Sequence, residues 1–118
     1  MPEGQSRLSV TQKQDVNIVE FADRKILEEL SIREIEEELA GLVDSNDAIK
    51  LLLNFDNVEH LSSAALGMLI NLDRQVAKKK GKLVLSDINP QIFEVFKITR
   101  LHKMFEIHNT AAEAMKHF

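Results

Sequence analysis

The chain has 118 residues, enough for one hydrophobic core, and its 44% apolar and 29% charged residues are typical of a soluble globular protein. A net charge of −4 argues against direct nucleic-acid binding, because phosphate contacts need concentrated positive charge. The absence of cysteine excludes disulfides and thiolate sites. The chain also contains no run of 18 apolar residues, which a membrane-spanning helix would need. We expect a cytoplasmic protein with a polar tail at residues 1–7 and a single domain at 8–118.

The first predicted elements are two short strands. Residues 8–12 and 16–21 carry the apolar and β-branched side chains that are typical of strands. Residues 12–15 lie between them and are predicted to form the turn of an antiparallel hairpin. The next segment, residues 24–30, is ambiguous, and we interpret it as a connection that crosses the end of the sheet.

A helix is predicted to follow this connection. Ser31 and Glu34 form a capping-box pattern, and Leu30 with Ile35 supplies the apolar pair known as a hydrophobic staple. The apolar residues of this helix recur at steps of three and four, which gathers them on one face: Ile32, Ile35, Leu39 and Leu42.

The middle of the chain predicts a buried strand and then a long helix. Residues 48–55 form a short, nearly continuous apolar run, as expected of a strand buried on both faces in the centre of a parallel sheet. Residues 63–80 have a helical pattern, and Gly81 is expected to end that helix. The apolar residues of this helix form one stripe: Ala65, Leu69, Leu72 and Val76.

The remainder predicts two more strands, at residues 82–86 and 104–107, each followed by a helix. Asn89 and the proline after it form an N-cap and a first-turn proline, and Thr110 with Glu113 forms another capping box. The last helix has an apolar face made of four residues: Ala111, Ala114, Met115 and Phe118.

The predicted order of elements is β-β-α-β-α-β-α-β-α. Strands that alternate with helices require right-handed crossovers and a mainly parallel sheet, to which the hairpin adds an antiparallel edge. The predicted fold class is therefore α/β, a mixed and mostly parallel sheet of about five strands flanked by about four helices.

Most enzyme classes lack their motifs in this chain. There is no GxGxxG, no P-loop lysine motif, no GxSxG elbow and no HExxH. The histidines are His60, His102, His108 and His117. No pair of them has the i,i+4 spacing of a helical metal site, so we expect no metal site, no cofactor and surface roles for these side chains.

Two other kinds of site, one catalytic and one for signalling, lack residues that they need around the centre of the chain. A serine hydrolase would need a base and an orienting acid beside Ser62 or Ser63, and the closeness of His60 in sequence does not make a triad. A phospho-accepting receiver domain would need acidic metal ligands at the end of the first strand, and only Asp56, after the third strand, is suitably placed.

The adjacent serines at the start of the second long helix are the remaining candidates for a site. Ser62 is a natural N-cap, because its side-chain oxygen can accept a hydrogen bond from a backbone N–H two or three residues on. Ser63 would then be the first helical residue and would project from the helix start. On the residues alone, capping is the simpler explanation of the pair.

The segment "VEHLSSAALGMLINL", residues 58–72, resembles the signature of the STAS domain family, as found in anti-sigma factor antagonists. That signature reads approximately hydrophobic-x-D-S-[ST]-G-L-G-hydrophobic. Leu66 and Gly67 match its Leu-Gly, which places Ser63 on the serine that a partner kinase phosphorylates. Residues 81–101 and 103–118 resemble the family's fourth strand, closing strand and their helices, so the resemblance extends from about Leu8 onward.

Two positions depart from the signature. Ser62 stands where the family has aspartate, and Ala65 stands where it has glycine. Serine keeps the N-cap role but removes a negative charge that could influence recognition by the kinase. Alanine favours the helix.

The resemblance implies a phosphorylation-switched binding module and not an enzyme. Its implied partners are an anti-sigma factor that is also a serine kinase with an ATP-binding kinase fold, and a phosphatase that resets the switch. The implied docking surface is Ser62 and Ser63 with the crossover before them: Asn57, Val58, Glu59, His60 and Leu61. The alternative is a constitutive, unphosphorylated STAS subunit of a lipid-transport ATPase or of a signalling scaffold.

Overall fold

The N-terminal hairpin forms one edge of the main sheet in the computed structural model, which describes residues 7–118. β1 (Leu8–Lys13) and β2 (Val16–Phe21) pair antiparallel, with Leu8 opposite Phe21. Gln14 and Asp15 both have positive φ, at 53° and 68°, the conformation that matches a two-residue turn to the twist of a hairpin. The predicted hairpin is confirmed.

The expected tail lies outside the described residues, apart from Arg7. The Arg7 guanidinium donates to the carboxylates of Glu34 and Asp23, at 2.6 and 2.9 Å. Its backbone N–H donates to the Glu38 carboxylate at 3.1 Å. These bonds fasten the chain to the first helix just before β1 begins.

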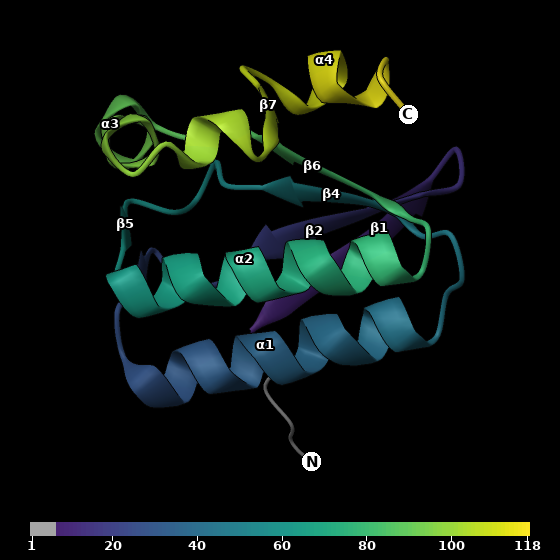
Figure 1. Ribbon diagram of the computed structural model, residues 1–118, viewed down its shortest axis with the longest axis horizontal. Helices are drawn as coiled ribbons and strands as arrows, with labels where there is room; N and C mark the ends of the chain where they lie inside the picture. The colour runs from purple at the N-terminus through teal and green to yellow at the C-terminus, as the bar shows by residue number, and fades with distance from the viewer. Residues whose placement is uncertain (1–6) are drawn as a thin grey trace.

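The main sheet has five strands in the order β1-β2-β4-β6-β7 (Figure 1). β4 (Lys50–Asn54) lies at its centre, and β6 (Lys82–Ser86) and β7 (Glu106–His108) follow on one side. Every pairing except β1 with β2 is parallel. Helices cover both faces, so Leu51, Leu52 and Leu53 are all fully buried. The predicted fold class is confirmed.

Two helices cover one face of this sheet. α1 (Glu29–Asp44) and α2 (Ser63–Lys78) lie side by side and begin at the same end of the molecule, the left of Figure 1. Their apolar stripes pack on alternate residues of the strands, including Leu51 and Leu53, to form the larger core. The predicted stripe of α2 is buried as expected.

The other face is covered by α4 (Ala111–Met115). Successive strand residues point to opposite faces, so Leu52 and Val84 pack there with Ala114 in a second, smaller core. Met115 and Phe118 pack against the rim of that core. The predicted apolar face of the last helix is therefore confirmed.

The predicted start of α1 is wrong. The helix begins at Glu29, and its N-cap is Glu28, which makes no side-chain capping bond. Ser31 instead lies in the first turn and is buried, while Leu30 is 64% exposed and cannot act as a staple. The cause is tertiary: the ambiguous segment contains β3 (Lys25–Ile26), which pairs with β5 (His60–Leu61) and brings the helix start forward.

The C-terminal elements are close to their predicted places. Asn89 caps α3 (Pro90–Ile98) by accepting from Ile92 N–H at 2.8 Å, and Thr110 caps α4 in the same way. The last strand is shifted to 106–108, because a 3₁₀ turn at Leu101–Lys103 precedes it. There a hydrogen bond from His108 to Glu106, helped by the charge of Lys82, lowers the pKa of the Glu106 carboxyl.

The left-handed residue that ends α2 is Lys80, directly after the C-cap Lys79, and not the expected glycine. Lys80 takes the left-handed conformation, with φ of 60°. Its N–H donates to the carbonyl of Ala77, and the Gly81 N–H donates to that of Val76, which is the Schellman arrangement. Gly81 serves a different purpose, since a Cβ there would lie 2.5 Å from the carbonyl oxygen of Ile49.

We expect Lys80→Gly to stabilise the protein by about 0.5–1 kcal/mol, because glycine adopts the left-handed conformation without steric cost. Urea denaturation measures the change. Lys78→Gly, in the last turn of the same helix, is the matched control and should instead lose a similar amount. A loss for Lys80→Gly would contradict the left-handed cap.

Candidate functional site

The predicted serine pair stands at the junction between a crossover and the start of α2. Ser62 has extended backbone angles, and its Oγ accepts a hydrogen bond from Ala65 N–H at 3.2 Å. Ser63 is the first helical residue, and its side chain is exposed. The predicted register at this helix start, with Ser62 as the cap, is therefore confirmed.

Two asparagine side chains brace the crossover that leads to these serines. The Asn57 amide donates to the carbonyls of Phe21 and Ala22, at 3.0 and 3.1 Å, and so ties the crossover to the end of β2. From the other side, the amide of Asn89 donates to the carbonyls of residues 58 and 59, at 3.3 and 3.2 Å. The crossover is thus held between β2 and α3 by bonds to its backbone and its own side chain.

The short β3–β5 pair fixes the last residues of the crossover. Ser62 N–H donates to the carbonyl of Ile26 at 3.1 Å, one residue beyond the pairing of Ile26 with Leu61. Ser62 and the crossover before it are therefore held by hydrogen bonds, and Ser63 follows directly from this fixed segment. The sequence predicts Asn89 as a helix cap but not its bonds to the crossover, and it does not show the β3–β5 pair, because two-residue strands have no periodicity.

The predicted docking residues differ in their exposure. Asn57, Glu59, His60 and Ser63 are exposed, whereas Leu61 and Ser62 are half-buried. Val58 is 2% exposed and belongs to the larger core. Val58 thus supports the crossover from beneath and does not offer its side chain to a partner.

Two exposed leucines lie in the segment that leads from β3, which pairs with the crossover, into α1. Leu27 follows Ile26, whose carbonyl binds Ser62, and it is 48% exposed. Leu30, in the first turn of α1, is 64% exposed. Neither has a signal in the sequence, since Leu27 lies in the ambiguous segment and Leu30 is expected there to pack as a staple.

The geometry around Ser63 does not assemble a hydrolase. Within residues 7–118, no histidine or carboxylate forms a hydrogen bond with its hydroxyl. The hydroxyl is instead exposed at the start of a sixteen-residue helix, where free N–H groups and the helix dipole favour negative charge. This environment suits a serine that receives an anionic group better than one that attacks a substrate.

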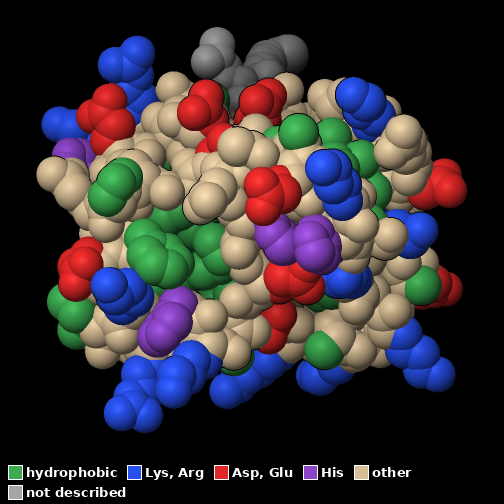
Figure 2. All heavy atoms as spheres, turned by 90° about the horizontal axis from the view of Figure 1, so that it is seen from above, with side chains coloured by type: hydrophobic (Ala, Val, Ile, Leu, Met, Phe, Trp, Pro, Cys, Tyr) green, Lys and Arg blue, Asp and Glu red, His purple; other side chains and the backbone are tan. Residues whose placement is uncertain are grey.

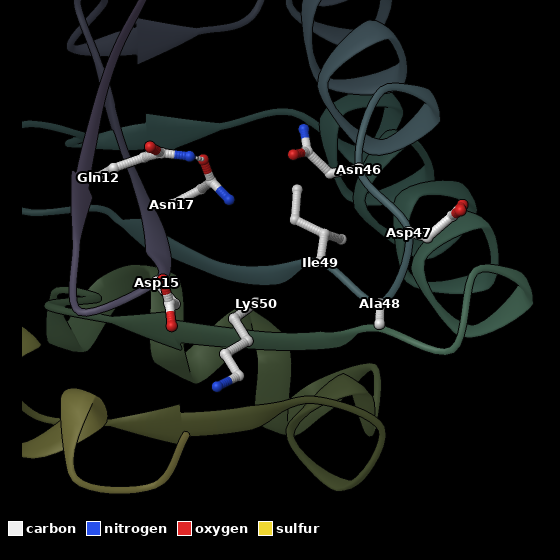
Figure 3. Close-up of a pocket in the computed structure, with 8 residues that line it drawn as sticks. All are labelled: Gln12, Asp15, Asn17, Asn46, Asp47, Ala48, Ile49 and Lys50. Carbon is white, nitrogen blue, oxygen red and sulfur yellow. Dashed lines mark hydrogen bonds between the residues drawn. The ribbon is translucent and has the colours of Figure 1, made fainter.

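The polar pocket drawn in Figure 3 lies away from this site. It has a volume of about 300 Å³ and is lined by the hairpin turn and by the segment that enters β4. A hydrogen bond of 3.1 Å joins Gln12 to Asn17 on one wall. Since the serines follow the opposite end of β4, this pocket plays no part in the candidate site.

We expect Ser62→Ala to lower the free energy of unfolding by about 0.5–2 kcal/mol, because it removes the bond to Ala65 N–H. Ser63→Ala should cost less, since Ser63 makes no capping bond. Chemical denaturation of both variants gives the comparison. The reverse order of stabilities would contradict the assignment of Ser62 as the cap.

The model of the STAS domain family matches residues 8–114, and the chain belongs to that family. Among the helices that the structure describes, none combines the length and the apolar character needed to cross a bilayer.

Named relatives and solved structures agree with this membership. BtrV of Bordetella bronchiseptica, classed by its name with the anti-sigma factor antagonists, is 27% identical over 93 residues, which are 79% of each chain. A STAS domain protein of Planctomyces limnophilus has a TM-score of 0.82 at 18% identity, over 94% of this chain and 96% of that one. Bacillus SpoIIAA in its phosphorylated form gives 0.69 at 14% identity, over 93% and 97%. These structures share the fold.

Proposed function

We propose that this protein is a phosphorylation-switched binding module that sequesters an anti-sigma factor and thereby frees a sigma factor for transcription. The observation that carries the proposal is the exposed hydroxyl of Ser63, held at the start of α2 by a braced crossover. Membership of the STAS family and the names of its relatives supply the class of partner.

The unphosphorylated form would offer a surface with no charge on the serine itself. Leu27 and Leu30 provide apolar contact area there, and the exposed crossover residues provide polar contacts. In this proposal the partner is an anti-sigma factor with an ATP-binding kinase fold, which packs over Ser63. The complex would form in the cytoplasm, where sigma factors act.

Phosphorylation would break the complex through charge and bulk. A phosphate on Ser63 adds about −1.5 to −2 charges to a chain whose net charge is already −4. The helix N-terminus favours that phosphate by roughly 0.3–1 kcal/mol, so the fold tolerates it. A partner packed over the serine would instead have to bury a solvated dianion. A phosphatase that removes the group would reset the module.

The structure also favours Ser63 over Ser62 as the acceptor. Ser62 is half-buried and its oxygen is occupied by the bond to Ala65, whereas Ser63 is exposed. The serine that replaces the family's aspartate keeps the cap, so this departure leaves the helix start intact. What it removes is one negative charge beside the acceptor.

Phosphopeptide mass spectrometry on the protein purified from its native cells tests the proposal. We expect one phosphate, on Ser63, in the wild type and also in Ser62→Ala. Ser63→Ala should carry none. Phosphate on Ser62, or none on the wild type under every growth condition that activates the sigma factor and every one that silences it, would contradict the proposed switch.

A further inference from the structure

A cluster of two histidines and a glutamate lies on the edge strand β7, on the face of the sheet that α4 covers. Glu106 and His108 are two residues apart on that strand and therefore point to the same face. Their partners on β6 are Val84 and Ser86. His117 returns to the same place after α4, and Figure 2 shows two histidine side chains lying against each other on this side of the molecule.

The two histidine side chains both lie close to one carboxylate oxygen of Glu106. His108 Nε2 lies 2.8 Å and His117 Nδ1 lies 3.8 Å from Glu106 Oε2. The donor atoms all lie within 4.8 Å of one another, and the two imidazole rings stack with centroids 4.2 Å apart. In a tetrahedral zinc site with bonds near 2 Å, donor atoms are roughly 3.4 Å apart. To bind the same ion as His108, the half-exposed His117 ring has to turn out of its stacked position until its Nδ1 points at the metal.

We propose that Glu106, His108 and His117 bind one zinc ion, with water completing its coordination. Two imidazoles and a carboxylate are a donor set that suits zinc and its transition-metal neighbours, whereas Mg²⁺ and Ca²⁺ prefer oxygen ligands alone. His108 and Glu106 share a proton in the hydrogen bond that now joins them. When zinc binds, the proton on Nε2 moves to Nδ1, so that His108 stays a neutral imidazole, and Nε2 and the Glu106 carboxylate oxygen both become ligands.

Sequence spacing did not predict this site. We expected no metal, because no two histidines have the i,i+4 spacing of a helical site. The cluster arises instead from two residues at i and i+2 on one strand, Glu106 and His108. The third ligand, His117, follows α4, which returns the chain to that strand. Bound zinc would tie the segment after α4 to the edge of the sheet, beside the smaller core that α4 covers.

Lys82 is the neighbouring charge that tunes the affinity. Its ammonium lies 3.5 Å from Glu106 Oε1 and also donates to the backbone carbonyl of His117. It therefore occupies the other carboxylate oxygen and leaves Oε2 for the metal. Its positive charge opposes a second cation, so we expect Lys82→Met to bind zinc at least about threefold more tightly than the wild type.

Zinc titration of the purified chain, with any affinity tag removed, tests the site by competition with a chromophoric chelator. We expect one zinc per monomer, and MgCl₂ should give no binding. Glu106→Gln, His108→Ala and His117→Ala should each weaken zinc binding by about tenfold or more. His60→Gln and His102→Gln are matched controls that lie outside the cluster and should bind as the wild type does. Circular dichroism confirms that each variant is folded.

Imidazole ¹⁵N shifts provide a readout that does not depend on stability. Zinc should shift Nε2 of His108 and Nδ1 of His117, the two nitrogens that face Glu106. Unchanged affinity in the His108→Ala and His117→Ala variants would overturn the proposal. So would equal losses in the two control variants, or one zinc shared between two chains.

Discussion

Ser63→Asp is expected to weaken binding of the proposed partner, a kinase-fold anti-sigma factor, by about tenfold or more, whereas Ser63→Ala should bind at least as tightly as the wild type. Ser63 is exposed at the surface on which the proposed partner packs. Aspartate places an unpaired charge there. It carries one charge where phosphate carries nearly two, so the loss should be smaller than that caused by phosphorylation. Titration calorimetry with the purified partner measures all three affinities.

A matched control tests whether the loss of affinity depends on where the charge is placed or only on its being added. Ala112 is exposed in the first turn of α4, which covers the opposite face of the sheet from α2. Ala112→Asp therefore adds the same charge at a helix start and should leave the affinity unchanged. An acidic residue in a first turn is favourable, so both aspartate variants should fold.

Equal affinity of the wild type, Ser63→Ala and Ser63→Asp, with no phosphate on Ser63 in cells, would exclude the switch. The constitutive STAS subunit would then be the better account. That alternative already has one observation in its favour, because Ser62 and Ala65 replace the aspartate and the glycine of the family signature.

Phe55→Ala should lower the free energy of unfolding by about 3–5 kcal/mol, the largest stability effect that we expect of a single residue near the site. The Phe55 side chain is 1% exposed, and its ring lies 5.0 Å from that of Phe21. Its N–H donates to the carbonyl of Ser86, and its own carbonyl accepts from Val58 N–H. A cavity there would thus open where the crossover leaves β4.

Urea denaturation of Phe55→Ala and Phe55→Leu checks this expectation. Leucine keeps much of the apolar volume and should cost clearly less than alanine. Because domains of this kind are stable by about 5–15 kcal/mol, the alanine variant should also show a much lower melting temperature. A cost below 1 kcal/mol for alanine would mean that the space beneath the crossover collapses without penalty.

The sequence could predict the elements whose patterns are local. The strand β4 follows from one apolar run and the stripe of α2 from one helical period, and Ser62 is predictable as a cap because a helical pattern begins directly after it. The same reasoning failed at Ser31. There the pairing of β3 with β5, more than thirty residues apart in sequence, moved the helix start.

The features of the site that the sequence did not show all depend on distant contacts. The exposure of Leu27 and Leu30 follows from where β3 places the start of α1. The bracing by Asn89 depends on α3 beginning beside the crossover, and Val58 is buried in the larger core that several elements share. Spacing along one chain segment cannot reveal such contacts, because the residues involved belong to different elements.

Hydrogen bonds from Asn57 and Asn89 hold the crossover in place, and this decides which measurements can detect the proposed switch. A segment held at several points does not have to move when a phosphate is added beside it. A fluorescence pair that reports distance, or a protease that senses loosening, should therefore give the same signal in both forms. Mobility in a native gel, which responds to charge, should distinguish them.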